Sequence, residues 1–237
     1  MTSIRTVGRW RAICLPVGLF LVWIAVASPV SWCESQSLTG HMVGHLLLMS
    51  LAPPLIWLSE PVRLLFSRAV PLIRMGPIRK VGAAMGHPVM CWLAATGALV
   101  GWHIPAALSL GMQSSTWHAI EQASFLAAGL LFWWPVVRPW PAVSTERGWS
   151  MVVYLFLGTL PCDILSGFLV FSERVAYPVY LSHGHSTVSI LDDQQYAGAL
   201  MWTVVTIVYL VAGVIVTTRL LSASTVQLTN PRGSEFV

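Results

Sequence analysis

The sequence predicts an all-α fold, a polytopic bundle of membrane-spanning helices. Of the 237 residues, 56% are hydrophobic and only 9% are charged, and the mean hydropathy is +0.72. Soluble domains carry about 25% charged residues, so a deficit spread along the whole chain indicates an integral membrane protein. The apolar runs are also long enough, because a bilayer core of about 30 Å requires about 20 apolar residues per helix.

About six segments meet this length requirement. In chain order, the expected transmembrane helices are 12–31, 41–58, 87–104, 117–137, 150–171 and 194–218. No internal repeat stands out, so residues 1–221 are expected to form one domain, followed by a polar, disordered tail at 222–237. The segment 61–75 alternates basic and bulky apolar side chains, which is typical of a helix lying on the membrane surface. A plain connecting loop is the alternative.

The basic residues predict the orientation of these helices. Of the 13 Lys and Arg residues, only Arg174 falls in a loop on the side opposite to the others. Because cytoplasmic loops carry the excess of Lys and Arg, both termini are expected in the cytoplasm of a bacterial inner membrane. The first span has a second interpretation, since its arginines, short apolar core and small residues at 25–28 resemble a cleaved signal peptide. We favour a retained helix, because the apolar run continues to Val30.

Histidines gather at one end of the predicted bundle. With this orientation, six of the seven histidines lie at the outer, periplasmic end, and only His87 lies at the inner end. The outer candidates for metal binding are His41, His45, His103, His118 and the acidic Glu121. Residues spaced i and i+3 or i+4 share a helix face, and imidazole suits copper, zinc, nickel and iron. For His183 and His185, in the last outer loop, an interfacial role is the simpler interpretation.

A second, deeper layer of weaker candidate ligands is predicted below this end. It consists of Met49, Met201, Cys162 and Asp163. Thioether and thiolate groups favour Cu(I), although methionine more often serves as core packing. An ionised Asp inside lipid usually faces the bundle interior and has a partner.

Two further features concern helix ends and kinks. The prolines at 53, 54 and 161 should kink their helices and free backbone carbonyls. Asp192 with Gln195 fits a helix N-cap with a residue three positions on that reaches back, and a functional role for this acidic pair is the alternative.

Other classes of function have no support in the sequence. The four cysteines contain no CxxC pair, so neither a disulfide framework nor a zinc knuckle is indicated. The net charge of +4 reflects membrane orientation, and no nucleic-acid partner is expected. There is no nucleophile–base pair and no phosphate-binding glycine loop, so we do not expect an enzyme.

Several motifs in order give the chain a resemblance to a known family. The segments "HMVGHLLLMSLAPPLIWLSEPVRLL", "GWHIPAAL", "WHAIEQASFLAAGLLFWWPVV", "YPVY" and "LDDQQYAGALMW" resemble the multispanning CtaG-type cytochrome c oxidase assembly factors from about residue 15 to residue 215. The resemblance implies a helical membrane protein that helps to install copper in a haem–copper oxidase. Its D-Q element falls on Asp193 and Gln194, which adds Asp193 to the candidate ligands. Gly44 departs from the family, whose members commonly have Gln there, and many members carry a further N-terminal span.

Three hypotheses follow. The first is a non-enzymatic assembly factor that holds copper at the outer membrane face and passes it to a cytochrome c oxidase subunit. The second is a b-type haem electron-transfer protein with axial histidines, such as His45 and His103, from two helices. The third is a transporter of copper or another small solute, for which Asp163 and the proline kinks would line a pathway.

Overall fold

The structure is a computed structural model that describes residues 9–27, 37–61, 86–137, 148–183 and 188–229. Every regular element within these ranges is helical, which confirms the all-α prediction. The elements are α1 (Arg9–Ala27), α3 (Leu38–Leu46), the π-helical η1 (Leu47–Leu51), α4 (Ala52–Leu58), α8 (Pro88–Trp102), α9 (Pro105–Gln113), α10 (Ser115–Val137), α11 (Ser150–Phe171), the 3₁₀ helix η3 (Pro178–His183) and α12 (Ile190–Thr229).

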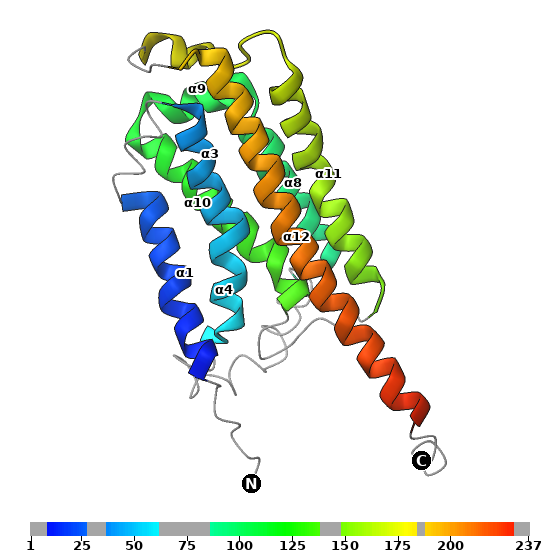
Figure 1. Cartoon of the computed structure of the whole chain (residues 1–237). Coiled ribbons are helices and arrows are strands. Elements are labelled where there is room, and N and C mark those ends of the chain that lie inside the picture. Colours follow the sequence, from blue (N-terminus) through cyan, green and yellow to red (C-terminus); the bar gives the residue numbers. More distant parts are fainter. Residues whose placement is uncertain (1–8, 28–36, 62–85, 138–147, 184–187, 230–237) are drawn as a thin grey trace.

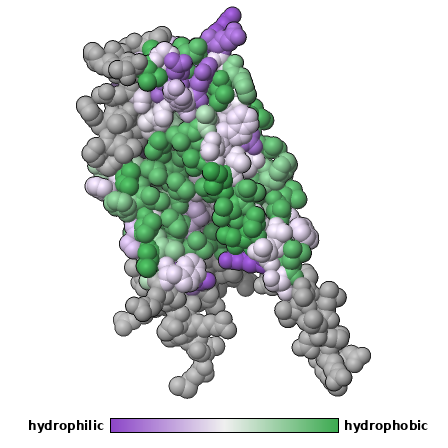
Figure 2. Space-filling view, viewed as in Figure 1, coloured by the Kyte–Doolittle hydropathy of each residue, from purple (hydrophilic) through white to green (hydrophobic). Residues whose placement is uncertain are grey.

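The helices form a membrane-spanning bundle. Five helical segments are long and apolar enough to cross a membrane, and there are six if α8 and α9, which are bent by 76°, count as one broken span. Figure 1 shows α9 lying across the end of the bundle at which α3 and α12 begin. Figure 2 shows a broad band of hydrophobic side chains across the middle of the molecule, with hydrophilic side chains at the end where α9 lies. The protein is therefore a multi-pass membrane protein.

The largest departures from the predicted spans are the helix α9 and the length of α12. The helix α9 was not predicted. It begins at Pro105, whose fixed φ suits the first position of a helix, and the extended Ile104 before it (ψ 128°) turns the chain away from α8. The expectation of a disordered segment from residue 222 is wrong for 222–229, because α12 continues to Thr229. Beyond its first residue, the proposed surface helix at 61–75 lies outside the described residues.

The first helix packs as part of the bundle. α1 contacts α4, and Arg11 near its start forms an ion pair with Glu60, just after the end of α4. Gly18 allows this approach, since a Cβ there would lie 2.9 Å from Ile56 Cγ1. The first helix and α4 thus pack closely along their length.

Tryptophan side chains satisfy the carbonyls that prolines leave free. Proline has no N–H for the carbonyl four residues before it, so Pro53 frees the carbonyl of Met49, and Trp133 Nε1 donates to that oxygen at 3.2 Å. Likewise Pro161 frees the carbonyl of residue 157, to which the indole of residue 92 donates at 3.0 Å. The π-helical turn η1 ends two residues before Pro53, and the N–H of residue 52 bonds the carbonyl of residue 47, an i to i−5 bond. The carbonyls that Pro53 and Pro161 leave free are therefore hydrogen-bonded within the protein.

The helix α10 lies at the centre of the contacts that position the site. It packs against α3, η1, α4, α8 and α9. Its close approach to η1 requires glycine at position 129, because a Cβ there would lie 2.7 Å from the carbonyl oxygen of Met49. This approach fixes the side chains of α10 against those of α3 at the end of the bundle where α9 lies.

Candidate metal centre

Glu121 is the centre of the histidine cluster. Its side chain is fully buried, and both of its carboxylate oxygens face imidazoles. Oε1 lies 3.2 Å from His41 Nε2 and 3.3 Å from His45 Nε2, and Oε2 lies 3.6 Å from His118 Nδ1. A buried carboxylate requires such partners, because burial of an unpaired charge is very unfavourable. Two neighbouring helices, α3 and α10, supply all four side chains.

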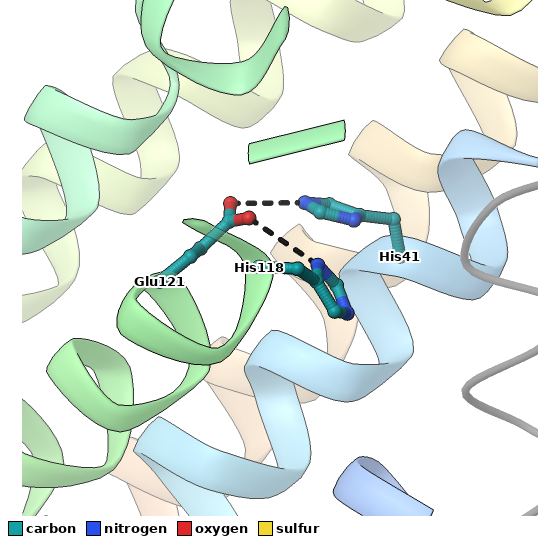
Figure 3. Close-up of side chains that lie close together, drawn as sticks. All are labelled: His41, His118 and Glu121. Carbon is teal, nitrogen blue, oxygen red and sulfur yellow. Dashed lines mark hydrogen bonds and ion pairs between the residues drawn. The ribbon is translucent and has the colours of Figure 1, made fainter. Parts of the chain in front are cut away.

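Three of these residues have the geometry of a metal site. One ligand atom from each of His41, His118 and Glu121 lies within 4.8 Å of the others, and Figure 3 shows the three side chains pointing toward one another from α3 and α10. Tetrahedral ligands of a transition metal are about 3.3 Å apart, so small side-chain movements would bring all three onto one ion. His41 and Glu121 are 0% exposed, whereas the side chain of His118 is 25% exposed. Access to the site is therefore from the His118 side.

Gln122 holds His118 from its other ring nitrogen. The amide nitrogen of Gln122 lies 3.0 Å from His118 Nε2 and 3.4 Å from the carbonyl oxygen of Ala25 in α1. Because an amide nitrogen only donates, Nε2 of His118 accepts this hydrogen bond, and in the neutral ring the proton is therefore on Nδ1, which faces Glu121. Gln122 thus fixes the ring of His118, and metal binding through Nδ1 requires the amide group to turn so that its oxygen accepts from the N–H at Nε2.

The four predicted imidazoles form a row. Their ring centroids are 6.0 Å apart for His118–His41, 4.2 Å for His41–His45 and 5.7 Å for His45–His103. The three predicted helices thus bring their histidines together in the protein interior. However, the carboxylate-centred cluster is at one end of the row, and His103 is at the other. The ring of His45 stands between them, stacked on Phe125 at 3.8 Å.

Asp193 lies apart from the imidazoles and caps α3. Its Oδ2 accepts a hydrogen bond from the backbone N–H of Leu38 at 2.6 Å, and its Oδ1 accepts from that of Thr39 at 3.3 Å. These N–H groups belong to the first turn of α3, which has no intrahelical partners for them. Asp193 therefore fixes the start of the helix that carries His41 and His45.

The residues beside Asp193 are also structural. Gln194 is buried, accepts from the N–H of Ala176 at 2.7 Å and ties α12 to the segment before η3. The prediction that Asp192 caps α12 is wrong, because Ser189 Oγ accepts from the N–H of Asp192 at 3.1 Å. The helix begins three residues earlier than the capping pattern suggested, at Ile190.

The sulfur atoms of the predicted deeper layer border one cavity. Met49, Met201 and Cys162 line a cavity of about 30 Å³ together with His45 and His103. Asp163 does not reach it. It lies in a groove between α11 and α12, where its Oδ1 has no hydrogen-bond partner among the described residues.

The remaining histidines lie elsewhere or outside what the structure describes. His87 is exposed at the start of α8, at the opposite end of that helix from His103. The backbone of His183 belongs to η3. Its side chain, and all of His185, lie outside the described part of the chain.

Four residues of the site were not singled out by sequence reasoning. Gln122 could have been found, since it is spaced i+4 from His118. Met42, whose sulfur lies 3.3 Å from His103 Nε2, Gly111 and Tyr177 act through contacts between distant segments. A Cβ at Gly111 would lie 2.5 Å from Glu121 Oε2, so only glycine lets α9 cover the carboxylate. The Tyr177 hydroxyl donates to the carbonyl oxygen of His103 at 2.9 Å, and burial raises its pKa to about 12.

Comparison with known families identifies the chain. The chain matches the family described as cytochrome c oxidase caa3 assembly factor (Caa3_CtaG) over residues 2–223. The chain belongs to this assembly factor family. No curated protein and no solved structure matches the chain.

The separate sequence motifs lie together at one end of the folded chain. In this caa3 assembly factor, the histidine pair of α3 and the His118–Glu121 element of α10 meet in one cluster. His103, from "GWHIP", completes the row, while "YPVY" and the D-Q element supply the structural contacts of Tyr177, Asp193 and Gln194. The motifs thus divide into candidate ligands and the residues that hold them in place.

Proposed function

We propose that this assembly factor binds a copper ion as cargo through His41, His118 and Glu121 and transfers it to a cytochrome c oxidase subunit. The observation that carries the proposal is the buried carboxylate of Glu121 with imidazoles on both of its oxygens. Imidazole is a good ligand for copper, and affinities for divalent metals generally peak at Cu(II). An oxidase assembly factor is a fitting place for such cargo, because a haem–copper oxidase must acquire copper during assembly.

The donor set suits an ion that must be released. Three ligand atoms leave at least one coordination position open, and a partner protein can use that position to take the ion. His118, the exposed member of the three, is the natural point of exchange. A closed four-ligand cage in the protein interior would hold the ion too firmly for a delivery role.

The membrane side of the site follows from charge. Arg11 is near the start of α1 and Arg219 is near the end of α12, at the end of the bundle opposite to the histidines. Since Lys and Arg accumulate on the cytoplasmic side, the histidine cluster is assigned to the periplasmic face. Cargo would be received and released there.

The alternatives fit the structure less well. The cavity beside His45 and His103 measures about 30 Å³, which leaves no room for a porphyrin, so a haem protein is disfavoured. A transport pathway is disfavoured because the aromatic rings of Phe132, Tyr154 and Tyr209 pack together in the core further inward, with centroid separations of 4.8 and 5.2 Å. An absorption spectrum without a Soret band and vesicles that take up no copper are the corresponding expectations.

Metal analysis tests the proposal. The full chain, purified in detergent and incubated with Cu(II), is expected to retain the ion. The double variant His41→Ala, His118→Ala and the single variant Glu121→Gln are expected to lose it. His87→Ala is the matched control, because this exposed histidine is remote from the cluster, and it should bind as the unchanged protein does. Equal copper content in all four proteins would overturn the proposal.

A further inference from the structure

The cavity on the inner side of the histidine row has a lining unlike that of the outer cluster. Its nitrogen and sulfur donors are His45, His103, Met42, Met49, Met201 and Cys162. Among the described residues, no carboxylate borders it, whereas a carboxylate is the centre of the outer cluster. The volume of about 30 Å³ is enough for one small ion or one water molecule.

The contact between His103 and Met42 brings two electron-pair donors together with no proton between them. His103 Nδ1 lies 2.7 Å from the carbonyl oxygen of Leu99, and because a carbonyl only accepts, Nδ1 carries the proton. In the neutral ring Nε2 is then a bare lone pair, and it lies 3.3 Å from Met42 Sδ. A thioether sulfur has no proton to donate. Two electron-pair donors therefore face each other in a buried place, and a metal ion between them would satisfy both.

The ring of His103 is already oriented as in metal-binding histidines. Metal-binding histidines commonly donate their other N–H to a backbone carbonyl, which fixes the tautomer and the ring plane. The carbonyl of Leu99 does this for His103, and the hydroxyl of Tyr177 holds the backbone carbonyl of His103 itself. His103 is thus fixed on both sides with Nε2 facing sulfur.

His45 connects this cavity with the outer cluster. Both of its ring nitrogens lack a hydrogen-bond partner within the described part of the chain. Its Nε2 is nevertheless only 3.3 Å from Glu121 Oε1, and its ring centroid is 5.7 Å from that of His103. His45 therefore borders both the outer cluster and the cavity.

We propose that this cavity is a second metal site, specific for a soft monovalent ion and so for Cu(I). His103 and Met42 are its principal ligands, and Met49, Met201 and Cys162 supply further sulfur. Thioether and thiol donors prefer Cu(I), while the carboxylate and imidazoles of the outer cluster accept divalent ions. This proposal rests on the proposed function only in naming copper as the natural ion. The preference for a soft monovalent ion follows from the residues that line the cavity.

Silver(I), a soft monovalent ion that stays in one oxidation state, is the probe that separates the two sites. The purified full chain is titrated with Ag(I) against a competing chelator, in the unchanged protein and in the double variant Met42→Leu, Met201→Leu. Leucine nearly preserves the volume of methionine but has no donor atom, so Ag(I) affinity should fall at least about tenfold while Cu(II) binding at the outer cluster persists. Cys162→Ser is expected to act in the same direction.

Matched controls and a direct measurement decide the result. Met151→Leu and Cys91→Ser change buried residues that do not line the cavity, and Ag(I) affinity should be unchanged in both. X-ray absorption of Ag(I) bound to the unchanged protein should show sulfur neighbours, and this measurement needs no variant. Unaltered Ag(I) affinity in the methionine double variant, or a spectrum with nitrogen and oxygen neighbours alone, would overturn the inner site. Failure of the outer cluster shows itself differently, as Cu(II) binding that does not respond to His118→Ala.

Discussion

Gly111→Ala should weaken metal binding at the outer cluster, because the added methyl group would displace the carboxylate of Glu121. A Cβ at position 111 would lie 2.5 Å from Glu121 Oε2, and an ordinary contact begins at 3.4 Å. The carboxylate must therefore withdraw by about 0.9 Å. Oε1 of the same group lies 3.2 Å from His41 and 3.3 Å from His45, so both distances cannot be kept after such a shift. Misplacement of a metal-site group costs about 10–100-fold in affinity, and we expect a loss of Cu(II) affinity in that range.

The effect on folding should be smaller than the effect on metal binding. Overpacking of this contact costs about 1–3 kcal/mol, but alanine is about 1 kcal/mol more favourable than glycine within a helix. The matched control is Gly97→Ala in α8, where an added Cβ meets nothing within 4 Å. Copper competition titrations and thermal unfolding of both variants provide the measurements. If Gly111→Ala binds copper as tightly as Gly97→Ala does, the close packing of α9 on Glu121 is not what positions the ligands.

Three further substitutions test the residues that support the site. Asp193→Ala removes the cap of α3 and should lower the free energy of unfolding by about 1–2 kcal/mol. The control Asp192→Ala changes an exposed neighbour and should alter this free energy by less than about 0.5 kcal/mol. Denaturant unfolding measures both. Trp133→Phe removes the indole N–H that donates to the carbonyl of Met49. The buried carbonyl is then unpaired, which should lower the free energy of unfolding by about 1–3 kcal/mol. Tyr177→Phe should cost about 0.5–1.5 kcal/mol. Burial raises the pKa of Tyr177 from 10.0 to about 12. Its contribution to the free energy of unfolding is therefore complete below pH 10 and is lost as the pH rises toward 12. Tyr177→Phe should remove this pH dependence, and the exposed control Tyr196→Phe should keep it.

The two proposed metal sites lie at opposite ends of the row of imidazoles and differ in their donor atoms. The carboxylate end lies beside His118, the most exposed of the four histidines, and the sulfur end is lined mostly by buried side chains. The exposed end suits exchange of a divalent ion with a partner, and the buried end suits a monovalent ion held away from bulk water. His45 borders both ends of the row.

The sequence by itself determined the fold class, most of the spans and the end of the bundle at which the histidines gather. Each of these depends on local properties. An apolar run of sufficient length must be a helix in lipid, because every backbone N–H and C=O there requires an internal partner. The arginines fix which ends lie together without any knowledge of packing. The pairing of His118 with Glu121 and of His41 with His45 likewise follows from helical spacing alone.

Only the tertiary structure decided what each candidate residue does. Asp193 has the chemistry of a ligand, yet it caps a helix that begins 155 residues earlier in the chain, and no local pattern reveals that contact. Gly111 and Tyr177 likewise act through segments that helical spacing does not connect. The π-helical turn Leu47–Leu51 alters the angular spacing below His45, so the depth and direction of Met49 could not be derived from a regular helix. The rotation and depth of each helix are set by packing against its neighbours, and these decide which donors share an ion.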